Sequence, residues 1–208
     1  MTMVNSGHAA SSRAGFLLAG GKSSRMGADK AFLDFAGQPL LDRGLDVLRA
    51  ACDTVTIAGD PTTFAKFGPA VGDVFPGCGP LSGIHAALLH SRAEHNAMLA
   101  VDMPFVSAEL LKFLFAAAAT GPAIVTVPRT SRGLQPLCAI YRREFATIAE
   151  KALRAGQYKM DTVLAAVPLR MVEEPELSAA GFSEKNFLNL NTPEDRRAAE
   201  DWPSIRKL

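Results

Sequence analysis

The chain has 208 residues with 22 Lys and Arg, 21 Asp and Glu, and a formal net charge of +1. Roughly 100–200 residues is typical of one domain, and 48% hydrophobic with 21% charged residues excludes a mostly disordered chain. The even charge balance gives no support to nucleic-acid binding, and no apolar run approaches the roughly 20 residues that span a bilayer.

Strands and helices are predicted to alternate along the chain. Residues 1–13 are expected to be a flexible tail without a signal peptide, which favours a cytoplasmic location, and residues 14–208 one domain. Apolar runs predict strands, and apolar residues at helical spacing predict helices. In chain order these are a strand at 14–18, a helix at 39–51, a strand at 54–58, a short strand ending near Asp73, a helix at 81–91, a strand at 97–101, a helix at 108–119, strands at 123–127 and 137–141, and helices at 143–155 and 193–201. The alternation indicates an α/β fold with a mainly parallel sheet.

The loop after the first strand, residues 19–30, combines glycines with basic side chains. Glycine lets a backbone approach a phosphate closely, and Lys22, Arg25 and Lys30 would add positive charge. The spacing fits neither a Walker A loop nor GxGxxG. Because ligands of parallel α/β sheets bind at the carboxyl ends of strands, a phosphate site is favoured over an ordinary basic surface loop.

Two aspartates follow other predicted strands. Asp102 stands at the carboxyl end of the buried run 97–101, where a carboxylate is a natural ligand for Mg²⁺. The alternative is a turn-forming Asp ahead of Pro104. Asp73 follows a short strand, and by itself it is only a strand-terminating residue.

The remaining polar residues have structural explanations as well. Thr192 and Pro193 fit the start of a helix, which leaves Asn189 and Asn191 just before them unexplained. Histidines at 85, 90 and 95 are spaced by five, so on a helix they share no face, and a solvated role is expected for them. Cysteines at 52, 78 and 138 form neither a disulfide framework nor a zinc motif and are expected to be unreactive core thiols.

Taken together, these motifs resemble the molybdenum cofactor guanylyltransferases, or MobA-type proteins, within the nucleotidyltransferase superfamily. The resemblance covers residues 15–200 and rests on Leu18-Ala19-Gly20-Gly21, Ser24-Arg25-Met26-Gly27, Asp29-Lys30, Gly37-Gln38-Pro39-Leu40, Gly79-Pro80-Leu81-Ser82-Gly83, Asp102-Met103-Pro104, Gln135-Pro136-Leu137-Cys138 and Asn189-Leu190-Asn191-Thr192-Pro193-Glu194. The LAGG form of the first motif and the late NxNTPE favour the guanylyl branch.

The resemblance implies a single-domain, Rossmann-like three-layer sandwich with a mixed sheet. It implies an enzyme that transfers GMP from GTP to the phosphate of molybdopterin, releases pyrophosphate and uses Mg²⁺. Further partners would be other cofactor-biosynthesis proteins and apo-molybdoenzymes. The residues implied are Leu18, Ala19, Gly20, Gly21, Lys22, Lys30, Asp73 and Asp102 for the nucleotide, Lys30, Arg25 and Asp102 for catalysis, Asp102 for the metal, and Asn189 and Asn191 for the acceptor.

One position departs from the family pattern. Where the family often has Asn after the second strand, this chain has Ala58. The nucleotide contact of that Asn side chain is therefore missing, and the sequence leaves open whether Asp60 replaces it. The alternatives are a cytidylyltransferase acting on the same cofactor, a sugar- or alditol-phosphate nucleotidyltransferase, and a non-catalytic GTP-binding protein that delivers cofactor. A Rossmann dehydrogenase is disfavoured because GxGxxG is absent.

Overall fold

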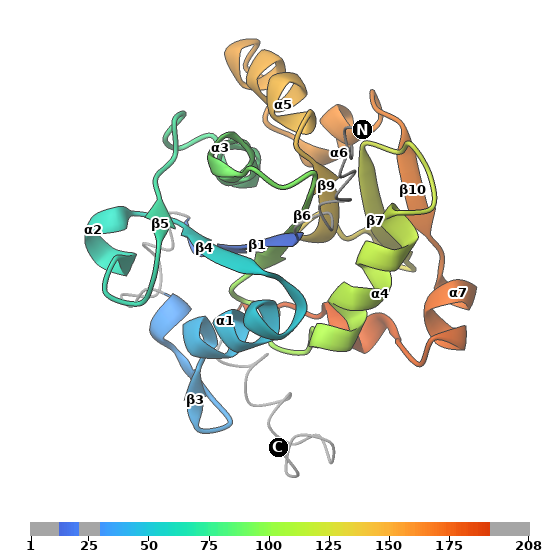
Figure 1. Ribbon diagram of the computed structural model, residues 1–208, viewed down its shortest axis with the longest axis horizontal. Coiled ribbons are helices and arrows are strands. Elements are labelled where there is room, and N and C mark those ends of the chain that lie inside the picture. Colours follow the sequence, from blue (N-terminus) through green and yellow to red (C-terminus); the bar gives the residue numbers. More distant parts are fainter. Residues whose placement is uncertain (1–12, 21–29, 192–208) are drawn as a thin grey trace, which may run out of the picture.

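The computed structural model describes residues 13–20 and 30–191 of the chain. Ten strands and nine helical segments occur in these ranges (Figure 1). The strands are β1 (Arg13–Leu18), β2 (Asp34–Phe35), β3 (Gln38–Pro39), β4 (Thr54–Ala58), β5 (Ala70–Val71), β6 (His95–Ala100), β7 (Val125–Thr130), β8 (Gly133–Leu134), β9 (Cys138–Arg142) and β10 (Leu169–Val172). The α-helices are α1 (Leu40–Ala51), α2 (Pro61–Phe64), α3 (Pro80–His90), α4 (Ala108–Ala118), α5 (Phe145–Arg154), α6 (Met160–Leu164) and α7 (Glu174–Ala179), and the 3₁₀ turns are η1 (Lys30–Phe32) and η2 (Glu184–Phe187).

The main sheet has the strand order β10-β7-β9-β6-β1-β4-β5, with β8 paired to β7 outside this path. Strand β1 runs parallel to both of its neighbours, β4 and β6, and β4 runs parallel to β5. Strand β9 is antiparallel to β6 and to β7, which makes the sheet mixed. The strands β1, β4, β5 and β6 therefore all end at one side of the sheet, the carboxyl edge, at Leu18, Ala58, Val71 and Ala100.

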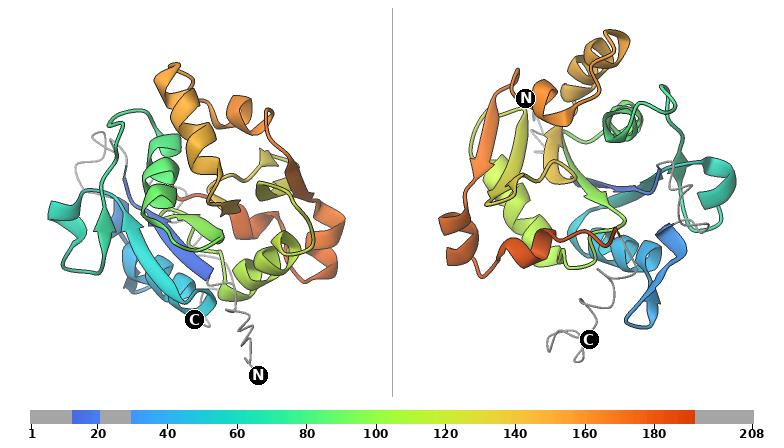
Figure 2. Two further views of the ribbon diagram at one scale, coloured as in Figure 1. Left: turned by 45° about the horizontal axis from the view of Figure 1, so that its top comes forward. Right: turned by 180° about the vertical axis from the view of Figure 1, so that it is seen from behind.

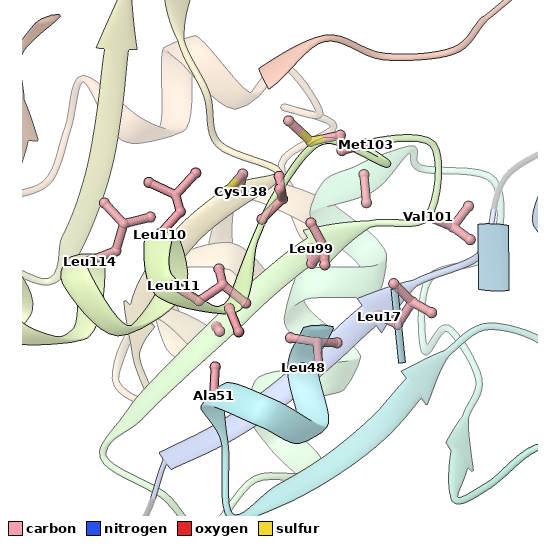
Figure 3. Close-up of a cluster of buried hydrophobic side chains, with 14 of the residues drawn as sticks. Leu17, Leu48, Ala51, Leu99, Val101, Met103, Leu110, Leu111, Leu114 and Cys138 are labelled. Carbon is pink, nitrogen blue, oxygen red and sulfur yellow. The ribbon is translucent and has the colours of Figure 1, made fainter. Parts of the chain in front are cut away.

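Helices cover both faces of the sheet and make three layers. Figure 1 shows α3 and α5 on one face and α1 and α4 on the other, and the view from behind in Figure 2 agrees. Leucines of α1 and α4 pack with Leu17 and Leu99 of the central strands in one core, shown in Figure 3. The second core lies between the sheet and the α3/α5 layer and contains Phe16 and Met98. Successive residues of β1 and β6 thus serve opposite cores, as the alternation of side chains in a strand requires.

Glycines allow α1 to pack closely on β1. A Cβ atom at Gly44 would come within 2.6 Å of Leu17 Cδ1, and one at Gly15 within 2.9 Å of Cys52 Sγ. The missing side chains therefore set the separation of helix and strand. This separation fixes the depth at which β1 ends and its following loop begins.

The predicted fold class is confirmed: the structure is α/β with a mostly parallel, mixed sheet. The strands and helices predicted up to residue 155 are present, with boundaries that differ by a few residues. No sequence pattern predicted the short hairpin β2–β3, the short strand β8, the helices α2, α6 and α7, or the edge strand β10. The expected tail at 1–13, apart from Arg13 in β1, and the helix at 193–201 lie outside the described residues.

Candidate functional site

Backbone hydrogen bonds draw together the ends of the central strands. The Val101 N–H donates to the Leu18 carbonyl oxygen at 3.1 Å, which continues the β1–β6 pairing to the edge of the sheet. The N–H groups of Ala19 and Gly20 both donate to the Ala58 carbonyl oxygen, at 2.9 and 3.1 Å. These two N–H groups are therefore occupied by hydrogen bonds to the sheet.

Three polar side chains that are far apart in the sequence meet at the carboxyl edge. The Lys30 ammonium group lies 3.4 Å from Asp102 Oδ2 and donates a hydrogen bond to Asn191 Oδ1 at 2.9 Å. The Leu190 N–H donates to the Asp102 carbonyl oxygen at 2.8 Å and so fastens the 188–191 segment over the end of β6. Lys30, Asp102 and Asn191 are called the edge cluster below.

Local structure explains the positions of Lys30 and Asp102. Lys30 opens η1, which is anchored by the fully buried Ala31 and by Phe32, whose ring lies 5.9 Å from the ring of Phe64. Asp102 follows β6 in a turn in which the buried Met103 donates its N–H to the Ala100 carbonyl at 3.2 Å. Apolar anchors on both sides therefore hold an ammonium group and a carboxylate at the solvent boundary.

Asp73 lies beyond β5 at the same edge of the sheet, on the side of α3. An added Cβ at Gly83 would lie 3.8 Å from Asp73 Oδ1 and 3.7 Å from Leu18 Cδ2, so these three residues surround one space. Packing against α3 desolvates the carboxylate and raises the pKa of Asp73, although the residue keeps access to solvent. A hydrogen bond from Ser82 and the charge of His85 act in the opposite direction on this pKa.

The structure thus brings some of the predicted residues together, and others lie outside the described residues. Leu18, Ala19, Gly20, Lys30, Asp73, Asp102 and Asn191 lie along one edge, and Asn189 is an exposed neighbour of Leu190. Gly21, Lys22 and Arg25 lie outside the described residues. The Leu190 backbone contact and the place of Ser82 beside Asp73 were not predicted from the sequence. A signal for Ser82 existed in the Gly-Pro-Leu-Ser-Gly motif.

A model of the MobA-like NTP transferase domain matches residues 15–172. The chain belongs to this family. A probable molybdenum cofactor guanylyltransferase from Clostridium perfringens is 35% identical over 183 residues, which cover 86% of this chain and 91% of the relative. This MobA-like chain is therefore a nucleotidyltransferase of molybdenum cofactor biosynthesis.

Solved structures agree with the family assignment. The crystal structure of molybdopterin-guanine dinucleotide biosynthesis protein A from Archaeoglobus fulgidus superposes with a TM-score of 0.81 at 26% identity, and the match covers 94% of this chain and 100% of that one. A Mycobacterium tuberculosis protein solved in complex with manganese shares the fold with a TM-score of 0.60 at 17% identity, and the match covers 90% and 97% of the two chains. No helix among the residues placed in the structure is long and apolar enough to cross a membrane.

The edge cluster fits a magnesium ion that is bound together with a nucleotide. No group of three or more His, Cys, Asp or Glu residues is assembled for a metal within 13–20 and 30–191. Mg²⁺ does not need such a cage, because it usually takes one or two carboxylates plus substrate phosphates and waters. The distance from Asp102 Oδ2 to the Lys30 Nζ atom is 3.4 Å, which is long for a hydrogen bond, and Oδ1 accepts no hydrogen bond from the described residues. The carboxylate therefore has free lone pairs for a metal.

The structure shows how Ala58 and Asp60 are placed in this MobA-like chain. The Ala58 side chain is buried in the core beneath α3, and its carbonyl oxygen faces the edge. The Asp60 carboxylate caps α2 and accepts hydrogen bonds from the Thr62 N–H at 3.0 Å and the Thr62 hydroxyl at 2.6 Å. Those hydrogen bonds lower the pKa of Asp60.

The expectation of three solvated histidines was wrong for His85. Its side chain is 1% exposed and packs in α3, while His90 is exposed at the end of that helix and His95 is half-buried at the start of β6. For the cysteines, burial raises the pKa of Cys52 and of Cys138 to about 12, which agrees with unreactive thiols. Cys78 differs from them because it lies half-exposed in the segment before α3.

Proposed function

We propose that this protein transfers GMP from GTP to the phosphate of molybdopterin and releases pyrophosphate. The observation that carries the proposal is the edge cluster, which holds an ammonium group, a carboxylate and an amide side by side at the carboxyl ends of parallel strands. Parallel α/β sheets bind ligands at this edge. The names of the related proteins support the choice of nucleotide and acceptor.

The reaction does not need a catalytic base. A phosphate monoester has a second pKa near 6, so the acceptor is largely dianionic at neutral pH and already nucleophilic. Catalysis then reduces to positioning the acceptor oxygen in line with the α-phosphate and stabilising charge. The side chains of the edge cluster suit that task, because none of them has to accept a proton.

Electrostatic repulsion between the two substrates is the main obstacle. At about 4 Å and an effective dielectric constant near 20, each pair of like charges costs about 4 kcal/mol. Lys30 would offset this cost by contacting the phosphates, and Lys22 and Arg25 are further candidates from the same loop. In the structure Lys30 contacts Asp102 and Asn191, which keeps the ammonium group oriented toward the edge.

Asp102 is the residue that would hold the magnesium ion. When bound, Mg²⁺ would supply Lewis acidity to the α-phosphate and the leaving pyrophosphate. Asn189 and Asn191 remain candidates for the acceptor side, with Asn191 shared between the acceptor and Lys30. The location of the protein in the cytoplasm, where it would meet these substrates, stays a prediction.

Pyrophosphate release tests the proposal directly. Wild-type protein is incubated with each of the four nucleoside triphosphates and Mg²⁺, with and without molybdopterin. GTP-dependent release that needs the acceptor is the expected result. Turnover of CTP instead would favour the cytidylyltransferase alternative. GTP binding without pyrophosphate release would indicate a delivery protein and overturn the proposal.

Variants of the edge cluster provide the second test. Lys30→Ala and Asp102→Asn are each expected to lower turnover by about two orders of magnitude or more, as loss of one charge-stabilising group does in comparable sites. Circular dichroism and the melting temperature should stay close to wild type, since both side chains reach the solvent boundary. Arg49→Ala is the matched control, because Arg49 and Asp46 form an exposed ion pair at the same 3.4 Å distance on α1. Near-wild-type rates for both cluster variants would remove the proposed site.

A further inference from the structure

The segment between β5 and α3, residues 72–79, carries Asp73 to the carboxyl edge although it belongs to no regular element. Gly77 and Gly79 have φ angles of 80° and 75°, which side-chain-bearing residues rarely adopt. Phe75 fastens this segment to the protein. Its carbonyl oxygen accepts a hydrogen bond from the Ser82 hydroxyl at 2.7 Å, and its ring packs against the α3/α5 layer.

The Phe75 ring is held between side chains of two helices that lie side by side on one face of the sheet (Figure 1). The His85 imidazole of α3 lies 5.4 Å from the ring centre at an interplanar angle of 60°. The Arg154 guanidinium of α5 lies over the ring at 5.6 Å and is itself paired with Glu150 at 2.7 Å. His85 is therefore one of the residues in contact with the ring that fastens the Asp73 segment.

Packing alone does not explain a histidine at position 85. The residue is 1% exposed, and neither ring nitrogen has a hydrogen-bond partner among the residues that the structure describes. Leaving a buried polar group unpartnered costs about 1–3 kcal/mol, a cost that a leucine or phenylalanine would avoid. The imidazole therefore has a role for which an apolar side chain of similar size would not suffice.

The charged groups around His85 indicate that role. Asp73 faces it from the segment before α3, and Glu150 and Arg154 face it from α5. Burial lowers the pKa of His85, with Asp73 and Glu150 acting against this shift, so the imidazole is neutral at neutral pH and gains a proton as the solution becomes acidic. For Asp73 the relation is reversed: burial raises its pKa, while Ser82 and His85 lower it. The Ser82 hydroxyl has one proton, which it donates to the Phe75 carbonyl oxygen. The positive charge of His85 is present only after the imidazole gains a proton, so its lowering effect on the pKa of Asp73 grows as the solution becomes acidic.

We propose that His85 is a positioning residue: its contact with the Phe75 ring holds the Phe75 segment on α3 and so places the Asp73 carboxylate for the nucleotide. The inference rests on the proposed function and on the expectation, implied by the family resemblance, that Asp73 contacts the nucleotide. An ionised carboxylate accepts hydrogen bonds with all its lone pairs, whereas the protonated form turns one oxygen into a donor. Loss of His85 would therefore weaken binding of the nucleotide but not of the acceptor.

The test compares the affinity of the His85→Leu variant and of wild type for GTP, in the presence of Mg²⁺, from pH 5 to pH 8. The expected result is roughly tenfold weaker binding at neutral pH, a size typical of coupled neighbours. The deficit should grow as the pH falls, since Asp73 then protonates at a higher pH than in wild type. The melting temperature should be unchanged or higher, because two unpartnered nitrogens are removed, and KM for the acceptor should be unchanged.

Matched variants separate positioning from packing. His90→Leu, at the exposed end of the same helix, should bind GTP as wild type does. In an Asp73→Asn background, His85→Leu should change the affinity by less than about twofold. Normal GTP binding by His85→Leu, or an equal loss at every pH and in both backgrounds, would overturn the proposal. If His85→Leu does not fold, His85→Gln replaces it and should show a smaller, pH-dependent deficit.

Asp73→Asn alone distinguishes this inference from the proposed function. If that variant binds GTP normally, Asp73 has no nucleotide contact and the positioning role of His85 is refuted. Pyrophosphate release by wild type would then still decide the transferase activity independently.

Discussion

At the scale of single residues, the pairing of Lys30 with Asp102 is better explained by ligand binding than by stability. The two groups are 3.4 Å apart with side chains 21% and 17% exposed. Exposed ion pairs contribute about 0–1 kcal/mol, and partial burial adds a desolvation cost for each charge. A pair so weakly favourable can separate at little cost when phosphates and a metal ion enter.

The cysteines allow a second prediction at the residue scale. Because the thiolate is the reactive form, the raised pKa values of Cys52 and Cys138 predict very slow modification in the folded protein at neutral pH. Cys138 lies among apolar side chains in the core shown in Figure 3. Labelling with a thiol reagent, read by mass spectrometry, should reach Cys138 only in denaturant, while the half-exposed Cys78 reacts first.

Serine variants complete this test. Conversion of each cysteine to serine should leave turnover largely intact, since none lies in the edge cluster. Cys138→Ser should nevertheless lower the free energy of unfolding by about 1–3 kcal/mol, because the serine hydroxyl would be buried among apolar side chains without a hydrogen-bond partner. Strong inhibition of the enzyme by modification of Cys138 in the native state would contradict this account.

At the scale of elements, α2 shows how a residue whose role the sequence left open can serve as a helix cap. Asp60 caps this four-residue helix by accepting hydrogen bonds from Thr62 and Thr63. Asp60→Ala should therefore cost about 0.5–2 kcal/mol of stability, measured by denaturant unfolding. GTP affinity should stay at the wild-type level. A large loss of affinity with unchanged stability would show that Asp60 contacts the nucleotide after all.

At the scale of the whole molecule, two histidines link stability to pH. Burial lowers the pKa of His85 and of His95 below the ordinary value, so in the window below about 6.5 the unfolded chain binds more protons than the folded one. The free energy of unfolding should therefore decrease as the pH falls from about 7.5 to about 6. The raised pKa of Asp73 acts in the opposite direction at lower pH.

Urea unfolding at several pH values would measure this effect. The variant His85→Leu/His95→Leu should show a flatter dependence on pH than wild type, with His90→Leu as the control that keeps the wild-type slope. An identical slope in all three proteins would show that neither buried histidine contributes.

The sequence by itself determined the order of most elements and indicated the edge of the sheet at which the candidate site lies. Apolar runs such as residues 97–101 are recognisable because a strand buried on both faces must be apolar throughout. The rule that ligands bind where parallel strands end then selected Asp102 and the glycine-rich loop. Short elements such as α2 and β10 were not predicted, since four residues carry too little periodicity to be recognised in a sequence.

Only the tertiary structure decided which polar residues meet and which are occupied elsewhere. Asn191 reaches Lys30 across 161 positions of sequence, and the Leu190 N–H finds the Asp102 carbonyl. Asp60, which the sequence left open, is engaged as a cap. His85 has the same five-residue spacing as His90 and His95, yet it is buried because α5 packs over that side of α3. Such outcomes depend on which helix covers which face of the sheet, and local sequence spacing does not contain that information.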